Sequence, residues 1–415
     1  MRLDLGVLVS YTLLIAAVGC SHAATVVQAG TPAAPPSAAP DSTAASEPAP
    51  FWSDTIRPWK SLSRGWNRVQ GRFGTGCAHD TIYAFKVRPG LTDKVMIFLN
   101  GGGMCWRSAT CDPKHPAVVM SADSPANDVS VRAGVLDYDN ERNPLRDWTM
   151  VFVSYCTGDA HLGSSDVEYV EPGAKDDAKT FHIRHGGAAN LEAVLDWVFV
   201  NLKRPTTILV AGSDAGAVAS PVVAARVARH YPRARVVQLG DGAGSYRSDS
   251  IPAMMGIWGA TDYLLHDPTY RSLDSADLDF QHLYLAAARA FPRIQFAQVN
   301  QVDDATQLAF LATLGSRETS LAKPLRQDFD ELRTDVSSFA TYTAPGKGHA
   351  LLRSNSIYTL KVDGKPFIDW LEALVNDDPV SDVGDKLLSP VPKPGRAPER
   401  HAPTPGSRAR SRASR

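Results

Sequence analysis

The sequence predicts an α/β fold in which a mostly parallel central sheet carries helices on both faces. Short, almost continuously apolar segments alternate along the chain with longer stretches of helical character. Such segments are typical of a sheet buried on both faces, because a solvated face would require polar residues at every second position. No repeat period is present, which disfavours a solenoid or a propeller. A chain of 415 residues that is 44% hydrophobic can bury one large domain of this kind, or two smaller ones.

The expected elements follow from local composition. Runs of Val, Ile, Phe and Leu bounded by Gly, Pro, Asn or Asp predict strands, and longer amphipathic stretches predict helices. We expect strands at 82–87, 94–99, 150–154, 207–210, 235–239 and 296–304, and helices at 186–201 and 217–230. A final amphipathic helix is expected to begin at 367–371, with its aromatic side chains in the core.

The N-terminus predicts an exported protein. Arg2 precedes an apolar stretch at 5–18 that is too short for a stable membrane span and is typical of a signal peptide, placed at 1–20. Its end, Ala-Val-Gly-Cys, resembles a bacterial lipobox, so Cys20 is a lipidation candidate. An ordinary secretory signal cleaved a few residues later is the alternative. We expect a bacterial outer-membrane lipoprotein, or a periplasmic or secreted protein.

Two segments of biased composition flank the predicted domain. Residues 21–50 are nearly all Ala, Pro, Ser and Thr and cannot form a core, so we expect a disordered linker. Residues 389–415 are Pro-rich and then basic, which is typical of a solvated tail; weak adhesion to an anionic polysaccharide is the alternative. The folded domain is therefore placed at 51–388.

The charges of the chain are balanced. Its 43 basic and 44 acidic residues give a formal net charge of -1, so no overall field attracts nucleic acid. We expect a monomer that acts on a small-molecule or polysaccharide substrate and meets a membrane only through an N-terminal lipid anchor.

Cysteine usage agrees with export. Besides Cys20 the chain has Cys77, Cys105, Cys111 and Cys156, and an even number in an exported protein predicts disulfides with three connectivities. The short separation of Cys105 and Cys111 favours pairing them, which leaves Cys77 with Cys156. A zinc site is disfavoured, because there is no CxxC pair and no nearby pair of histidines.

A glycine triplet directly follows one of the expected strands. Asn100, Gly101, Gly102 and Gly103 come after the apolar run at 95–99. Because the three glycines have no side chains, their backbone N–H groups can face a ligand, as in the oxyanion loops of esterases. The triplet therefore predicts a candidate oxyanion loop.

A second motif has the pattern of a hydrolase nucleophile elbow. An expected strand runs into Gly212-Ser213-Asp214-Ala215-Gly216 and then into a helix, which is the Gly-x-nucleophile-x-Gly pattern. The two glycines lack the Cβ atoms that would clash in so sharp a turn. Asp214 stands at the apex, and the N–H of Ala215 is a candidate oxyanion donor. A nucleophile displaced to Ser213 is disfavoured, because only the apex side chain faces the histidine.

Such a site also requires an acid and then a histidine along the chain. The strand expected at 296–304 ends in Asp303 and Asp304. His349 follows in a Gly- and Pro-rich loop, where it would lie over the edge of the sheet instead of packing on a helix. These residues are candidate partners of Asp214.

Together these motifs resemble the pectin acetylesterase family, which includes plant enzymes and the animal lipid deacylase Notum. The resemblance runs from Cys77 to Trp370 and rests on residues 100–106, 155–159, the elbow, 240–244 and the Asp304/His349 pair. It implies an α/β-hydrolase fold and a serine carboxylesterase mechanism without a cofactor or metal. The implied substrates are O-acyl groups, often acetyl groups on a polysaccharide.

The resemblance also assigns roles to individual residues. The family's triad and oxyanion donors fall on Asp214, Asp304, His349, Gly101, Gly102 and Ala215. Asp214 takes the place of the nucleophile serine, Asp304 that of the acid, and His349 that of the histidine. Asp303 is the alternative acid, but Asp304 has the family's spacing of three residues to Gln307.

Other polar and aromatic residues are candidates for the substrate pocket. They are Trp106, Asp159 and His161, with a buried structural role as the alternative for Trp106. His182 and His185 are expected at the surface or in the pocket. The glycine-rich loop 241–244 is expected at the mouth of the site, and it lacks the Lys and Ser/Thr of a phosphate-binding loop.

Asp214 leaves three functional hypotheses open. The first is a family esterase with feeble activity, because a carboxylate attacking an ester would have to form a mixed anhydride, and the tetrahedral adduct on the way to it mostly collapses backwards. Loss of a triad nucleophile costs on the order of a million-fold in kcat. The second is a hydrolase with an aspartate nucleophile, like haloalkane dehalogenases or epoxide hydrolases. The third is a non-catalytic protein that binds acylated glycans. In each case Asp214 is expected to raise the pKa of His349 by ion pairing.

Overall fold

The computed structural model describes residues 56–114, 118–174 and 179–388. The predicted signal peptide with Cys20, the linker at 21–50 and the tail at 389–415 lie outside these ranges.

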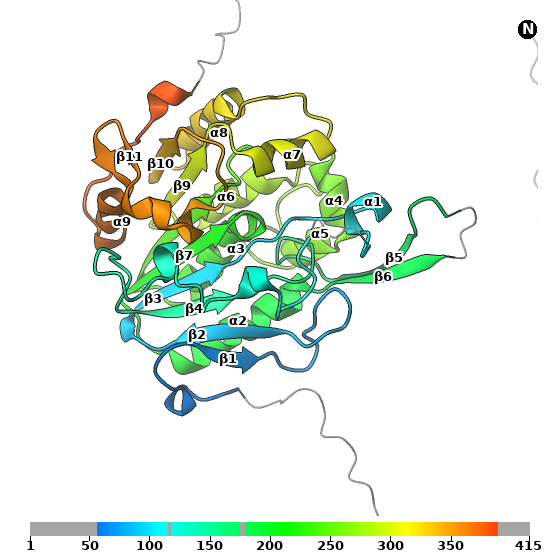
Figure 1. Cartoon of the computed structure of the whole chain (residues 1–415), viewed down its shortest axis with the longest axis horizontal. Coiled ribbons are helices and arrows are strands. Elements are labelled where there is room, and N and C mark those ends of the chain that lie inside the picture. The colour runs from blue at the N-terminus through cyan, green and yellow to red at the C-terminus, as the bar shows by residue number, and fades with distance from the viewer. Residues whose placement is uncertain (1–55, 115–117, 175–178, 389–415) are drawn as a thin grey trace, which may run out of the picture. The chain divides into compact units, whose positions relative to one another are not determined.

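A central eight-stranded sheet organises the described residues (Figure 1). Its strands lie in the order β1-β2-β4-β3-β7-β8-β9-β10. All neighbours from β4 to β10 pair in parallel, whereas β1 and β2 extend one edge through antiparallel pairings. The strands are β1 (Asn67–Gln70), β2 (Ala84–Arg88), β3 (Leu91–Leu99), β4 (Trp148–Val153), β7 (Thr207–Ser213), β8 (Arg235–Asp241), β9 (Gln295–Gln301) and β10 (Phe339–Ala344). This arrangement confirms the predicted mostly parallel sheet and agrees with an α/β-hydrolase-like fold.

Helices cover both faces of the sheet, as predicted. Successive residues of β3 alternate between two hydrophobic cores: Ile97 lies in one, and Phe98 in the other. Helices α2, α3, α6 and α8 contribute to the first core, and α9 contributes to the second. The helices are α1 (Ser108–Cys111), α2 (Gly187–Asn201), α3 (Ala215–His230), α4 (Ile251–Ile257), α5 (Ala260–Leu265), α6 (Phe280–Ala290), α7 (Ala305–Thr313), α8 (Ala322–Asp335) and α9 (Phe367–Asn376).

The expected elements agree with the structure except at some boundaries. Strands β3, β7 and β8 contain the predicted segments and extend beyond them. The strand expected at 82–87 begins at Ala84 instead, after a partly exposed Ile82. The strand expected at 296–304 ends at Gln301, so its carboxylates lie in the following turn. Helix α9 begins at Phe367 as predicted, and its aromatic residues Phe367 and Trp370 are buried in the core.

A two-stranded hairpin outside the main sheet was not expected from the sequence. It consists of β5 (Ser165–Val170) and β6 (Thr180–His185), which pair antiparallel and project away from the central sheet (Figure 1). A short ribbon, β11 (Lys361–Val362) with β12 (Lys365–Pro366), precedes α9.

Both predicted disulfides are confirmed. Cys77 pairs with Cys156, and Cys105 pairs with Cys111. The first bond joins the segment before β2 to the segment after β4, and the second closes the turn that contains α1.

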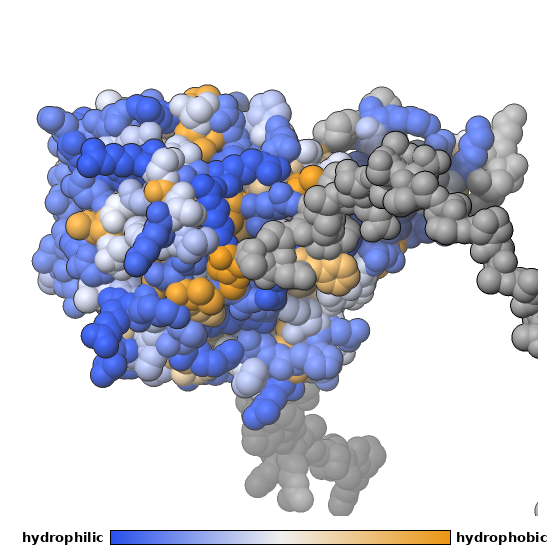
Figure 2. All heavy atoms as spheres, turned by 90° about the horizontal axis from the view of Figure 1, so that it is seen from below, coloured by the Kyte–Doolittle hydropathy of each residue, from blue (hydrophilic) through white to orange (hydrophobic). Residues whose placement is uncertain are grey.

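The surface is mixed in character. On the face shown in Figure 2, apolar residues form small patches among hydrophilic ones, which is ordinary for a globular protein. Among the described helices, none has the length and apolar character needed to cross a membrane.

Candidate active site

The elbow places Asp214 at the apex of a strained turn. β7 ends at Ser213, α3 begins at Ala215, and Asp214 between them has φ 52° and ψ −123°. A positive φ is unfavourable for a residue with a Cβ, and such strain is found at functional sites. A Cβ on Gly212 would lie 2.2 Å from the carbonyl oxygen of Gly216, and a Cβ on Gly216 would lie 2.1 Å from that of Leu99. Both glycines are therefore required for the turn.

Two backbone amides of the glycine loop hold the carboxylate of Asp214. The N–H groups of Gly102 and Gly103 donate to its Oδ2 at 2.9 and 2.8 Å. This donor pair is displaced by one residue from the predicted Gly101 and Gly102, because the direction of each N–H depends on the backbone angles of the loop. Gly101 instead allows close approach, since a Cβ there would lie 2.5 Å from the Cβ of Asp214. The predicted donor Ala215 is the first residue of α3, at the positive end of that helix.

His349 lies between two carboxylates. It follows β10, and its Nδ1 is 2.7 Å from Oδ2 of Asp304. Its Nε2 is buried, lacks a hydrogen-bond partner among the described residues, and lies 3.7 Å from Oδ1 of Asp214. That separation is longer than a hydrogen bond, so the attraction across it is electrostatic. The structure thus brings the predicted residues Asp214, Asp304 and His349 together in the order Asp–His–Asp.

Asp304 is itself held by the start of a helix. It caps α7, because its Oδ1 accepts the backbone N–H groups of Thr306 and Gln307. The side chain of Gln307 also donates to Oδ2 at 3.1 Å. This cap points the second oxygen at His349, whereas no contact of the neighbouring Asp303 with His349 is described.

The two carboxylates change the protonation of the site. Burial lowers the pKa of His349, but Asp214 and Asp304 outweigh it and raise the pKa from 6.5 to about 10. Burial raises the pKa of Asp214, but His349 and the amides of Gly103 and Gly102 outweigh it, so the pKa lies below its ordinary value. At neutral pH the site therefore contains an imidazolium, which cannot act as a base.

Asp241 is a further residue of the site that the sequence did not single out as an anchor. It ends β8 and is buried, although the loop 241–244 was expected to form the mouth of the site. Its carboxylate accepts the hydroxyl of Ser213 at 2.8 Å and the backbone N–H groups of Leu351 and Leu352 at 3.1 and 2.8 Å. Burial raises its pKa to about 6 in spite of these hydrogen bonds. Asp241 thereby ties the turn after His349 to the elbow.

The site opens into a cavity of about 910 Å³. The glycine loop, Asp214 and His349 are among the residues that line it. Val119, Met120 and Val131 add apolar surface, and Arg353 adds a guanidinium group that donates to Oδ1 of Asn100 at 2.7 Å. The cavity is large enough for an acyl group together with part of the alcohol that carries it.

The three predicted pocket residues do not line this cavity. Trp106 is buried and packs edge-to-face against Phe310, with ring centroids 5.8 Å apart. Asp159 and His161 are fully buried behind the glycine loop. All three belong to the protein interior because their polar atoms or rings have partners within the fold.

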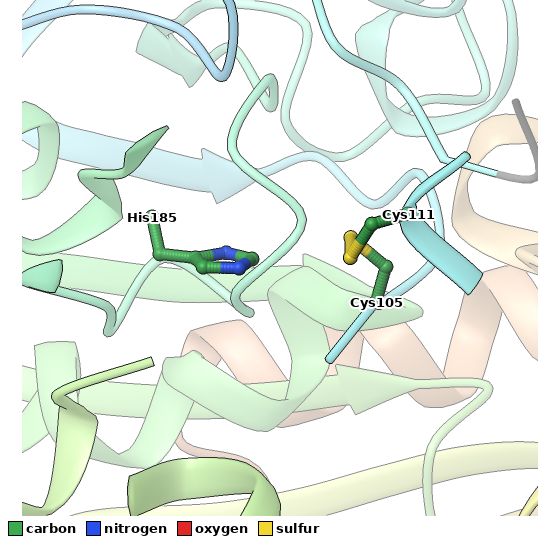
Figure 3. A group of neighbouring side chains, drawn as sticks. All are labelled: Cys105, Cys111 and His185. Atoms are coloured by element: carbon green, nitrogen blue, oxygen red, sulfur yellow. A yellow bond between two sulfur atoms is a disulfide. The ribbon is translucent and has the colours of Figure 1, made fainter. Parts of the chain in front are cut away.

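Of the two other histidines, His182 is exposed at the surface, as expected, whereas His185 is in the interior. His182 lies between Asp80 and Asp166. His185 lies beside the Cys105–Cys111 bond (Figure 3), and these three residues come close enough to suggest a metal site. Their atoms are already engaged, since the sulfurs form the disulfide and both ring nitrogens of His185 contact Tyr169 or the carbonyl of Thr157.

The geometry defines the class of protein. A strand-turn-helix elbow, a histidine and an acid at strand ends, and two amides that face the apex are the components of an α/β-hydrolase site. Comparison with protein families finds a match: residues 72–251 are similar to the model of the pectinacetylesterases. This match confirms the resemblance inferred from the sequence and indicates a carboxylic ester hydrolase. It includes the glycine loop and the elbow and ends before Asp304. No curated protein matches the chain.

Proposed function

We propose that this protein is a carboxylic ester hydrolase of the pectin acetylesterase type, which removes O-acyl groups, acetyl above all, from a glycan or another ester. In this proposal Asp214 occupies the nucleophile position and makes hydrolysis slow. One observation carries the proposal: Oδ2 of Asp214 accepts the amides of Gly102 and Gly103, at the place where an ester oxygen would become an oxyanion.

The position of that oxygen explains the expected slow rate. An ester carbonyl can reach the two amides only if it displaces the carboxylate of Asp214, which carries a full charge and is favoured there. Attack by the other oxygen, Oδ1, would form a tetrahedral adduct, from which the carboxylate of Asp214 leaves more readily than the alkoxide, so little mixed anhydride would form. His349 would remain protonated through both events, so no base would be present at neutral pH.

Restoring a hydroxyl at the apex tests the proposal. In the Asp214→Ser variant the amides become free and His349 gains a hydroxyl partner. We expect hydrolysis of p-nitrophenyl acetate to rise by up to about a million-fold, the factor lost when a triad nucleophile is removed. Release of acetate from an acetylated polysaccharide, measured with the same two proteins, then identifies the substrate class.

Two variants serve as controls. Asp214→Ala frees the amides without supplying a nucleophile, and it should gain far less than Asp214→Ser. The double variant Asp214→Ser with His349→Ala should lose the gain. If Asp214→Ser folds but hydrolyses no ester faster than the parent protein, the esterase proposal is wrong.

A specific observation also favours a second candidate, a hydrolase with an aspartate nucleophile. With Oδ2 of Asp214 bound to two amides, Oδ1 is left on the side of His349. Oδ1 could displace a leaving group from an sp³ carbon, forming an alkyl ester. Attack of hydroxide on the Cγ of Asp214 would then release the alcohol and leave one water oxygen in the carboxylate. Among the described residues that line the cavity there is no Trp or Tyr to bind a halide or an epoxide oxygen, which makes this candidate the weaker one.

Isotope labelling separates the two candidates. After many turnovers of a haloalkane or an epoxide in heavy-oxygen water, the peptide that contains Asp214 should gain mass if this carboxylate is the nucleophile. An unlabelled peptide after measured turnover would eliminate the second candidate, and it would leave the esterase proposal untouched.

We also propose export with a lipid on Cys20. The family match and the two disulfides are compatible with an exported protein, and the lipobox-like sequence before Cys20 supports the finer assignment. Cells that express the chain should attach labelled palmitate to it, and Cys20→Ser should abolish the label. A protein that is exported without any label would contradict the anchor.

A further inference from the structure

We propose that Tyr155 and His161 are positioning residues, which hold the glycine loop so that the amides of Gly102 and Gly103 point at the apex of the elbow. The role in catalysis rests on the proposed esterase function, but the positioning itself does not. Neither residue lines the cavity, so each would act only through the loop.

Hydrogen bonds from these side chains hold both ends of the loop. The hydroxyl of Tyr155 donates to the carbonyl oxygen of Gly103 at 2.7 Å, and Nε2 of His161 lies 2.8 Å from that of Asn100. Because a carbonyl can only accept, His161 must carry its proton on Nε2. Between the two, the backbone N–H of Val119 donates to the carbonyl of Gly102 at 2.8 Å.

Each of these bonds sets the direction of an amide. A peptide group is planar, so fixing a carbonyl also fixes the N–H of the next residue, which points the opposite way. The bond to Gly102 thus directs the N–H of Gly103. The bonds from His161 and Tyr155 to the carbonyls of Asn100 and Gly103 hold the peptide groups that flank the N–H groups of Gly102 and Gly103. This restraint is needed because Gly102 and Gly103 have φ of 159° and 80° and could adopt many other conformations.

The segment that carries His161 is itself held in an unfavourable conformation. Ala160 and His161 both have positive φ, of 53° and 61°, which is unfavourable for residues with a Cβ. Such strain persists only where surrounding contacts enforce it. Here the carboxylate of Asp159 accepts the N–H groups of His161 and of Gly187, the first residue of α2. The strained segment is thereby anchored to the start of a helix.

The two side chains also support each other. The backbone N–H of Ala160 donates to the hydroxyl of Tyr155 at 3.1 Å, and the rings of Tyr155 and His161 lie with centroids 4.9 Å apart. Both are fully buried, and burial lowers the pKa of His161, which keeps the ring neutral. The contact with Asn100 requires a proton on Nε2, which one tautomer of the neutral ring supplies.

A matched pair of tyrosines allows a controlled test. Tyr155→Phe removes one hydroxyl that donates to a backbone carbonyl and accepts a backbone N–H. Tyr342 is buried in the other core and makes the same two kinds of bond, to the carbonyl of Lys365 and from the N–H of Val362. Tyr342→Phe therefore reproduces the lost hydrogen bonds away from the glycine loop.

The first readout is independent of activity. In the full Asp214 protein labelled with ¹⁵N-glycine, the amides of Gly102 and Gly103 bond to a carboxylate. In Tyr155→Phe and in His161→Phe we expect their proton resonances to shift upfield and their exchange with solvent to accelerate by roughly 10-fold or more. Tyr342→Phe should leave both unchanged, and His161→Gln, which keeps an N–H donor, should restore them in part.

The second readout uses the Asp214→Ser background. There Tyr155→Phe and His161→Phe should lower kcat by roughly 10- to 100-fold, because misplaced oxyanion donors lose transition-state stabilisation while KM stays within about twofold. Equal effects of Tyr155→Phe and Tyr342→Phe would reduce the proposal to a general loss of stability and overturn it, as would unchanged Gly102 and Gly103 amides. If Asp214→Ser is itself inactive, the esterase proposal fails, and the amide readout still decides the positioning.

Discussion

At residue 214 a carboxylate has three sources of positive potential around it. They are the amides of Gly102 and Gly103, the N-terminal end of α3, and His349. Together they favour the ionised form and keep the carboxylate turned into the oxyanion site. The same contacts that would stabilise an ester's transition state therefore stabilise the resting side chain.

The charge of Asp214 should be visible in the titration of His349. We expect Asp214→Asn to lower the pKa of His349 from about 10 toward 6.5, because one of the two carboxylates that raise it becomes neutral. NMR titration of the imidazole ring measures the change. Asp303→Asn is the matched control, since it removes an equal charge beside Asp304 without touching the ring; an equal shift in that variant would contradict the assignment.

The same pKa predicts a stability difference with a defined sign. Because the folded pKa lies above 6.5, protonated His349 stabilises the fold fully below pH 6.5, and this contribution is lost as the pH rises through about 10. The parent protein should therefore lose more stability than Asp214→Asn between pH 6.5 and pH 10 in denaturant titrations.

Which residues form this site could be predicted from the sequence, but the directions in which their backbone N–H groups point could not. The spacing and order of Asp214, Asp304 and His349 were sufficient to group them. The amides that face Asp214 belong to Gly102 and Gly103, one residue later than predicted. The N–H directions of three consecutive glycines depend on backbone angles, which the sequence of a glycine triplet does not specify. Asp241 escaped notice as an anchor, since its partners are backbone amides more than a hundred residues away.

At the scale of the element, the elbow depends on close contact between its backbone and the end of β3. Gly216 leaves room for that contact, and Gly212 leaves room for the backbone of Gly216 within the elbow itself. The pattern was recognisable from the sequence because these glycines interrupt an apolar strand and a helix at fixed spacing. The β5–β6 hairpin was missed, because the strands were placed on apolar runs, whereas burial alternates along β5 as in a half-buried strand.

Gly216→Ala tests this contact. Alanine ordinarily stabilises a helix by up to about 1 kcal/mol relative to glycine. At Gly216, however, the new methyl would lie 2.1 Å from the carbonyl oxygen of Leu99, so we expect a loss of about 3 kcal/mol in unfolding free energy. Gly256 in α4 is the control, because a Cβ there meets nothing within 4 Å. Gly256→Ala should be neutral or stabilising, and similar losses in both variants would contradict the argument.

At the scale of the whole domain, the sheet buried on both faces could be predicted because its strands are continuously apolar. Its antiparallel edge could not, since β1 is a four-residue strand with a single hydrophobic position, Val69. The disulfide pairing followed from chain separation alone, and it leaves one long and one short covalent loop.

The two disulfides should differ in their contribution to stability. In the chain-entropy description, the Cys77–Cys156 bond, with a separation of 79 residues, contributes about 4 kcal/mol, and the Cys105–Cys111 bond, with a separation of 6, contributes about 2 kcal/mol. Thermal unfolding of Cys77→Ser/Cys156→Ser should therefore show a larger fall in Tm than that of Cys105→Ser/Cys111→Ser. The reverse order would mean that local contacts of the short loop outweigh the entropy of the long one.

The conformation of the elbow is set by its neighbours and not by the side chain at its apex. Residue 214 can therefore be exchanged while the scaffold stays the same. The protein and its Asp214→Ser variant therefore differ in one functional group within the same fold. Such a pair can measure, within one protein, how much of an esterase's rate acceleration is due to its nucleophile and how much to the site around it.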